Sequence, residues 1–310
     1  LDPVRQDFAV IEAGINQPGE MRPLGQMICA DLNVLTNIGA AHLERLGSLD
    51  NIAAEKSLLA EFAVTDSPIV LHAESLGYTA YAELAHRAVA LVPEGQAVPE
   101  WPVKELVRYR IDSCGDGGHQ VTVGNQSYRI SSSSRGIARN AALAIVAAQR
   151  LGIAEVDLRE RIEAWLPSGN RGRLETCGTQ TFYIDCYNAN PSSMADALDA
   201  FILCAPEAAA RFYILGAMNE LGSSAITQHE AIGRSLQLRP RDQVAFVGPV
   251  ELTQAYERGA LAVGADRRQV HCADTFEKIK SNVAQFEGAF FLKGSRSYQL
   301  ELLLPPGIQE

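Results

Sequence analysis

The stretch TFYIDCYNANPSSMADALDAFI (181–202) joins an apolar run to a helical pattern through a polar corner. The run FYI (182–184) is continuous, as in a strand buried on both faces, whereas the apolar residues after Met194 recur at helical spacing. Asn190 is suited to cap that helix, and Pro191 fits its first turn, where the missing N–H costs nothing. The stretch therefore predicts a strand–helix unit of an α/β domain.

Two residues of this corner, Tyr187 and Asn188, are not needed to build the turn. A flat ring and an amide would lie beside Asp185 at the carboxyl end of the predicted strand. Open α/β sheets bind ligands at that end. We therefore expect Tyr187 and Asn188 to contact a ligand, and a nucleotide suits this pair.

The rest of the chain alternates short β-rich runs with helical patterns, which indicates βα units around mainly parallel sheets. The runs are FAVIEAG, LNVLTNIG, PIVLHAE, TFYIDCY, RFYILGA, DQVAFVG and AFFLKGS. QVTVGNQSYRI (120–130) predicts a hairpin turning at Gly124-Asn125. Helices are expected over about 137–151 and 156–165, and the Gly/Pro-rich loop at 166–175 predicts a domain boundary. We assign residues 1–171 and 172–310 to two domains.

Length and composition exclude several classes of protein. The chain has 310 residues, 47% hydrophobic and 21% charged, with no apolar run of the roughly 20 residues that a membrane helix needs. A formal charge of -10 argues against broad nucleic-acid binding. Six scattered cysteines without a CxxC pair indicate neither a zinc site nor a disulfide framework, which favours a cytoplasmic location.

Polar residues after the first two expected strands suggest a cation site. Glu12 ends the first run, and Thr36-Asn37 end the second, with His42 in the loop beyond. Ser48 or Asp50 can cap the helix that carries Lys56. Glu12 and His42 together predict mixed O and N ligands for a hard cation. The alternatives are a solvent-facing Glu and a structural histidine.

Further polar residues point to an anion pocket. Asn140 opens the helix of RNAALA, and Arg173 lies in the interdomain GRLE, where its guanidinium can reach a phosphate or simply be solvated. Lys293 and Arg296 place two cations at a strand end, and Ser295 can cap the helix that follows. Because cations oppose the dipole of a helix start, a binding role is favoured over a basic helix start.

These segments, in this order, resemble the Mur ligases, and most closely the branch that adds D-alanyl-D-alanine to UDP-N-acetylmuramoyl-tripeptide. The resemblance rests on EAGINQPGE, TNIGAAHLERLGSL with Lys56 downstream, RNAALA, GRLE, DCYNANPSSM, GAMNELG and KGSRS. It spans nearly the whole chain. The YNANP corner and KGSRS discriminate best, because sister ligases differ at both places, and the DNPR motif of the diaminopimelate-adding relatives is absent.

The resemblance implies a partial P-loop-type ATPase domain followed by a Rossmann-like domain, and an ATP-dependent amide ligase of cell-wall precursor synthesis. Such an enzyme activates a carboxylate as an acyl phosphate, which the amine of D-Ala-D-Ala attacks. The matching positions make Glu12, His42 and a carbamylated Lys56 ligands of Mg²⁺, and place Asn140, Arg173, Asp185, Tyr187 and Asn188 around ATP. His42, Lys56 and Lys293 would be catalytic, and Asn37, Ser295 and Arg296 would bind substrate.

The chain departs from the family's pattern in three places. None of its five lysines follows a glycine, so the Gly-Lys-Thr/Ser phosphate loop is missing, together with the amino-terminal UDP-binding domain. Ala217 replaces a usual Asp, and the His usually found before RNAALA is missing near Gly136. We therefore expect the chain as it stands not to turn over ATP. A fragment of a ligase, a natural short form serving as a scaffold, and a ligase for another acceptor stay open.

Overall fold

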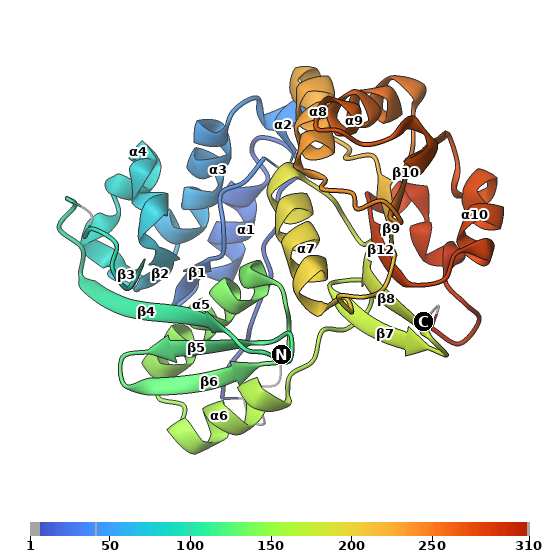
Figure 1. The fold of residues 1–310 in the computed structure, drawn as a ribbon. Helices are drawn as coiled ribbons and strands as arrows, with labels where there is room; N and C mark the ends of the chain where they lie inside the picture. Colours follow the sequence, from blue (N-terminus) through green and yellow to red (C-terminus); the bar gives the residue numbers. More distant parts are fainter. Residues whose placement is uncertain (1–6, 41, 99, 309–310) are drawn as a thin grey trace. The chain divides into compact units, whose positions relative to one another are not determined.

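The computed structural model describes residues 7–40, 42–98 and 100–308. The chain divides into two compact units, one reaching to residue 109 and including 143–152, the other formed by 110–142 and the chain from 153 onward. Figure 1 shows the elements of each unit in sequence colours. Within the described ranges, no helix is both long and apolar enough to cross a bilayer.

The first unit is built on parallel strands. These are β1 (Asn33–Leu35), β2 (Ile69–His72), β3 (Ala88–Pro93) and β4 (Glu105–Ser113), which pair in that order, β4 continuing into the second unit. Its helices are α1 (Met21–Ile28), α2 (Leu43–Leu46), α3 (Leu49–Glu61) and α4 (Thr79–Ala82). The Ser48 hydroxyl caps α3 by accepting from the Asn51 N–H, as the sequence predicts.

The expected first strand at FAVIEAG does not form, and that prediction is wrong. Residues 7–15 have no strand assignment, and the Val10 side chain is 97% exposed. A strand exists only when a neighbour takes up its backbone N–H and C=O groups. Among the described residues, β1 pairs with β2 alone, so the segment has apolar sequence without a strand partner. Glu12 is consequently an exposed loop residue rather than a strand-end residue.

The predicted hairpin is confirmed in the second unit. Strands β5 (His119–Val123) and β6 (Gln126–Ile130) are antiparallel, and Gly124 has the positive φ, 58°, that a two-residue hairpin turn requires. The expected helices are also present as α5 (Arg135–Arg150) and α6 (Glu155–Ala164). α6 packs on β6, and the Tyr128 hydroxyl donates to Glu155 at 2.6 Å.

A second sheet forms most of the second unit. Its strands are β7 (Arg173–Cys177), β8 (Gln180–Asp185), β9 (Arg211–Gly216), β10 (Gln243–Val247), β11 (Val270–Ala273) and β12 (Ala289–Lys293), in the order β11-β10-β9-β12-β8-β7. All neighbours are parallel except β7 and β8. β12, the last strand along the chain, therefore lies between β9 and β8.

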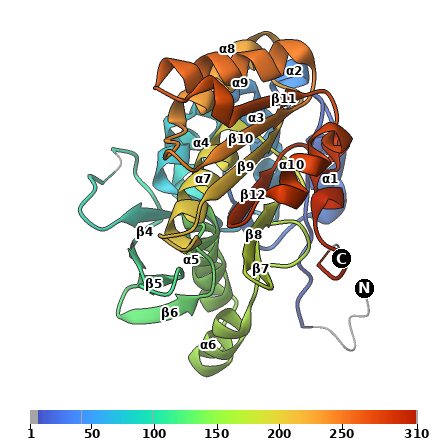
Figure 2. The ribbon, with the colours of Figure 1, turned by 45° about the vertical axis from the view of Figure 1, so that its right-hand side comes forward.

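Two helical layers bury this sheet. α7 (Pro191–Cys204), α8 (Ala225–Ser235) and α9 (Val250–Ala262) cover one face, where Tyr183, Phe201 and Phe291 share a core. α10 (Lys280–Gln285) and the short 3₁₀ turns near it cover the other face, where the rings of Phe182 and Phe290 stack with their centroids 4.8 Å apart. Figure 2 shows α7 and α10 on opposite sides of the strands. Burial on both faces explains the continuous apolar runs of the sequence.

The corner between β8 and α7 is built as the sequence predicts. The Asn190 side chain accepts from the Ser193 N–H at 2.9 Å, and the Ser193 hydroxyl receives the Asn190 N–H at 3.1 Å. Pro191 begins the helix. This capping box satisfies helix-start donors and fixes where the chain leaves the sheet.

Glycines allow two neighbouring strands to approach closely at their carboxyl ends. A Cβ atom on Gly294, just after β12, would lie 2.7 Å from the Gly216 Cα, and one on Gly216 would lie 3.0 Å from the Gly294 Cα. Backbone atoms cannot swing away as a flexible side chain can. Both positions therefore require glycine for the strand ends to meet.

Gly294→Ala is expected to destabilise the second unit by about 1–3 kcal/mol, because the added methyl group forces two strand ends apart. Urea unfolding followed by circular dichroism measures the change. Gly115→Ala is the matched control, since a Cβ there meets no atom within 4 Å. Equal stability of the two variants would contradict the close-approach argument.

Candidate functional site

Residues predicted from separate motifs meet at the carboxyl edge of the second sheet. β8 ends at Asp185 and β12 at Lys293, and these two residues are partners in the parallel register. The corner with Tyr187 and Asn188 follows β8, and Ser295 and Arg296 follow β12.

The centre of this edge is a buried ion pair. The Lys293 ammonium lies 2.6 Å from an Asp185 carboxylate oxygen and also donates to the Asn188 carbonyl at 3.2 Å. The Lys293 side chain is 2% exposed and that of Asp185 19%. Lys293 is thus one of the two cations predicted at this strand end, and it is ion-paired, because a buried ammonium needs a nearby anion.

Arg296 is a largely exposed cation whose guanidinium makes one ion pair. A terminal nitrogen lies 2.9 Å from Glu301, whose carboxylate is largely buried, while the Arg296 side chain is mostly exposed. A guanidinium has five donors in a planar fork, so one ion pair leaves donors for a carboxylate or phosphate.

Ser295 does not cap the turn that follows it, contrary to the expectation. Its hydroxyl instead accepts from the Asn219 N–H at 2.9 Å, and its own N–H donates to the Ala217 carbonyl at 3.2 Å. The Asn219 amide also donates to the Ser297 hydroxyl at 3.0 Å and accepts from the Tyr298 hydroxyl at 3.2 Å. Asn219, which the sequence analysis did not single out, thus ties the loop after β9 to the loop after β12.

The Tyr187 ring lies half-exposed in the corner between β8 and α7. It is 48% exposed, and the Arg171 guanidinium carbon lies 3.8 Å from its centroid. The Tyr187 N–H donates to the Asn170 carbonyl at 3.1 Å, and the Asn188 side chain accepts from the Ala189 N–H at 2.8 Å. Arg171 is a neighbour that the sequence did not reveal, because cation–π contacts leave no spacing signal.

Arg173 is a strand residue and not a linker charge, which corrects the loop predicted there. It begins β7, where Ile184 is its register partner, and it donates to the Ile308 carbonyl at 2.8 Å besides pairing with Glu175 at 3.3 Å. Its Nε is buried without a hydrogen-bond partner, as is the side-chain oxygen of Asn170. Asn140 is an exposed residue in the second turn of α5.

The first unit carries the other predicted residues. The Lys56 ammonium donates to the Asn37 carbonyl at 2.7 Å, and burial lowers the pKa of Lys56. His42 has a left-handed backbone, with φ 59°, and its carbonyl accepts from the Arg45 and Leu46 N–H groups of α2. The Lys56 side chain thus ties α3 to the loop after β1.

Glu55, the neighbour of Lys56, organises the loop that carries part of the first motif. Its carboxylate accepts from the Gly19 N–H at 2.9 Å and the Met21 N–H at 3.0 Å. Glu20 in turn accepts from the Asn16 N–H at 2.6 Å. The sequence did not reveal this role of Glu55, because Glu55 and Gly19 are 36 positions apart in the chain.

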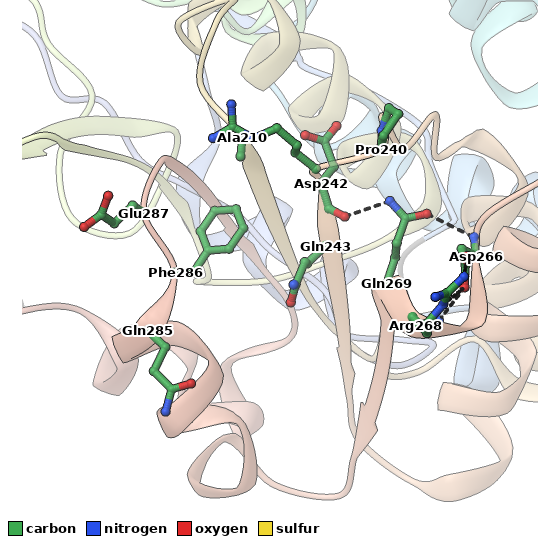
Figure 3. A pocket seen from close by; sticks show the side chains of 11 residues that line it. Ala210, Pro240, Asp242, Gln243, Asp266, Arg268, Gln269, Gln285, Phe286 and Glu287 are labelled. Carbon is green, nitrogen blue, oxygen red and sulfur yellow. Dashed lines mark hydrogen bonds and ion pairs between the residues drawn. The ribbon is translucent and has the colours of Figure 1, made fainter.

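A group of three or more His, Cys, Asp or Glu side chains that could hold a metal is absent from the described part of the chain. A pocket of about 730 Å³ lies elsewhere, near the starts of β10 and β12. Figure 3 shows Phe286, Gln243 and Gln269 around it. It contains none of the predicted site residues.

Comparison with known proteins identifies two domains. The model of the Mur ligase middle domain matches residues 2–148, and that of the Mur ligase glutamate ligase domain matches 172–296. The UDP-N-acetylmuramoyl-tripeptide–D-alanyl-D-alanine ligase of Treponema pallidum is 30% identical over 306 residues, which are 96% of this chain and 62% of that protein. The chain thus spans about three fifths of this relative's length.

Solved structures show the same fold. MurF from Acinetobacter baumannii has a TM-score of 0.76 at 21% identity, over 94% of this chain and 62% of that one. The MurF ligase of Thermotoga maritima, solved in complex with ADP, has a TM-score of 0.72 at 18% identity, over 93% of this chain and 64% of that one. With both domain models matched along most of its length, the chain belongs to the Mur ligase family.

Proposed function

We propose that this chain is the part of an ATP-dependent amide ligase that joins D-Ala-D-Ala to UDP-MurNAc-tripeptide in the synthesis of the peptidoglycan precursor. The observation that carries the proposal is the carboxyl edge of the second sheet, where Asp185 ends β8, Lys293 ends β12 with Arg296 after it, and the half-exposed Tyr187 ring follows β8. The similarity to the Treponema ligase supports the choice of substrates.

The corner after β8 fits a nucleotide. Tyr187 offers a half-exposed ring for a base, with the Arg171 guanidinium already stacked on it. Two buried polar atoms, the Asn170 Oδ1 and the Arg173 Nε, have no hydrogen-bond partner. Native proteins rarely leave such atoms unpaired, so a polar ligand that completes their bonding is a physical explanation. Asp185, Asn188 and Asn140 are the further residues that we assign to nucleotide binding.

ATP, when bound, would supply the phosphoryl group that activates the tripeptide carboxylate. The protein's own contribution is placement of charge. Lys293, ion-paired with Asp185 and bonded to the Asn188 carbonyl, fixes the shape of the corner at the strand end. The exposed guanidinium of Arg296 suits the carboxylate of the incoming dipeptide, with Ser295 beside it. In the first unit, Asn37 is the residue that we assign to substrate binding.

Mg²⁺ fits the first unit only if Lys56 changes its charge. Glu12 and His42 are ligand types that Mg²⁺ accepts, but the Lys56 ammonium donates to a carbonyl and would repel a cation. An N-carboxylated Lys56 would be an anion able to bind metal. The lowered pKa supports this step, because only the neutral amine adds to CO₂.

Lys293→Met is expected to destabilise the second unit by about 3 kcal/mol, because it leaves the largely buried Asp185 carboxylate unpaired. The double variant Asp185→Asn/Lys293→Met should recover most of that stability while binding ATP about tenfold or more weakly in the full-length gene product. Urea unfolding and calorimetric titration measure the two quantities. Lys278→Met, which removes an exposed ion pair, is the control. If the double variant binds ATP as tightly as the wild type does, the assignment of Lys293 to the site is wrong.

Incubation with ¹³C-bicarbonate is expected to label Lys56 with a carbamate carbon seen by NMR. Labelling should increase with pH, because the amine loses its proton more readily, and Mg²⁺ should slow its loss. Lys56→Arg should abolish the signal, and Lys104→Arg should leave it unchanged. A carbamate signal that persists in Lys56→Arg would contradict this assignment.

The reaction itself is tested by amide formation in the full-length gene product with ATP, UDP-MurNAc-tripeptide and D-Ala-D-Ala. We expect a dipeptide-dependent release of phosphate together with a new amide product detected by mass spectrometry. Product with another acceptor but none with D-Ala-D-Ala would contradict the acceptor assignment. ATP binding without any amide product would favour a binding protein built from the same domains.

A further inference from the structure

A buried histidine lies directly behind the carboxyl edge of the second sheet. His229, on α8, is 0% exposed. Its Nε2 lies 2.9 Å from the Met218 N–H, and its Nδ1 lies 2.6 Å from the Ala225 carbonyl. An N–H can only donate and a carbonyl can only accept, so the imidazole is neutral, with its proton on Nδ1.

His229 acts together with Tyr256 of α9 on the end of β9. The two rings meet edge to face with centroids 4.6 Å apart, and the Tyr256 hydroxyl donates to the Gly216 carbonyl at 3.2 Å. Gly216 and Met218 are thus each held by a buried side chain. The loop that begins there has its backbone fixed from within the helical layer.

The fixed loop leads directly to a contact with Ser295, which is a predicted substrate residue, and with its neighbour Ser297. Asn219 follows Met218, and its N–H donates to the Ser295 hydroxyl, while its side chain donates to the Ser297 hydroxyl. The Met218 N–H and the Asn219 N–H belong to consecutive peptide groups. A shift of one peptide group therefore moves the other, and with it the contact to KGSRS.

We propose that His229 is a positioning residue, whose uncharged Nε2 holds the Met218 N–H and thereby keeps the loop after β9 bonded to Ser295 and Ser297. The assignment of Ser295 to substrate binding rests on the proposed function. The positioning itself rests only on the contacts within the second unit.

The same geometry makes the loop sensitive to acid. A protonated imidazole would present an N–H to the Met218 N–H, so the bond would be lost. Burial lowers the pKa of His229, and its neutral ring is therefore favoured in the folded protein. Tyr256 from α9 is a neutral phenol, and the neighbouring Glu230 pairs with Arg234 and Arg258. Loop order is thus present above the ordinary histidine pKa and decreases as pH falls below it.

The first test is NMR on the 310-residue protein with ¹⁵N-labelled histidine. We expect the shifts of His229 to report a protonated Nδ1 and an unprotonated Nε2 at pH 7.5. A proton on Nε2 would overturn the proposal without any variant. Hydrogen exchange of the Met218 and Asn219 amides should accelerate together as the pH is lowered and His229 titrates, after correction for intrinsic exchange.

Variants separate positioning from simple packing. His229→Gln keeps an acceptor near the Nε2 position, so it should retain protection of both amides within about threefold and lose their acid transition. His229→Leu fills the space without an acceptor and should lower that protection about tenfold or more. His271→Gln, a change at another partly buried histidine, is the control and should alter neither amide. Equal protection in the Leu and Gln variants, or an acid transition that persists in His229→Gln, would overturn the proposal.

Binding of D-Ala-D-Ala to the full-length gene product tests whether the positioning role of His229 matters for function. We expect the dipeptide affinity of wild type to fall with the same pH midpoint as amide protection, and the Gln variant to lack that fall. If dipeptide does not bind to wild type while the exchange results hold, the proposed function fails and the positioning role stands. If dipeptide binds and both variants match wild type in affinity and exchange, the positioning role fails instead.

Discussion

The ion pair between Lys293 and Asp185 is the interaction on which the site depends. It joins the ends of two neighbouring strands in a largely buried position, where neither charge is stable without the other. Its further bond to the Asn188 carbonyl fixes the corner that presents Tyr187. A single pair of opposite charges therefore sets the geometry of the loops after β8 and β12 while leaving little net charge at the sheet edge.

Around this pair, the loops are held by uncharged contacts from several directions. Gly216 and Gly294 let the strand ends approach, and Asn219 bridges the loops after β9 and β12. Behind them, the buried rings of His229 and Tyr256 hold the backbone of β9. Arg296 is the exposed cation of the motif, and a largely buried Glu301 orients it. A backbone fixed by these contacts around one exposed cation is suited to a site that must accept a charged substrate.

The sequence predicted the second sheet well, because its strands are buried on both faces and read as continuous apolar runs. The capping box at Asn190 was equally readable, since its atoms belong to neighbouring residues. The sequence failed at FAVIEAG, where strand-like composition has no strand partner, and at Arg173, where Gly-rich flanks hide a strand. It could not show that Lys293 is paired, because that contact spans 108 positions. Local pattern reports propensity, whereas pairing depends on which segments the fold makes neighbours.

The place of β12 in the sheet has a consequence for how the domain assembles during synthesis. β8 and β9 emerge from the ribosome first, yet they are not neighbours, because the position between them belongs to β12, the last strand of the sheet along the chain. Until that strand is made, both flanking strands have an open edge, and Asp185 has no ammonium beside it. The centre of the sheet therefore cannot form strand by strand as the chain is synthesised, because β8 and β9 pair with β12 only after β12 has been made. A chaperone that shields the open edges of β8 and β9 would help such a nascent chain to fold.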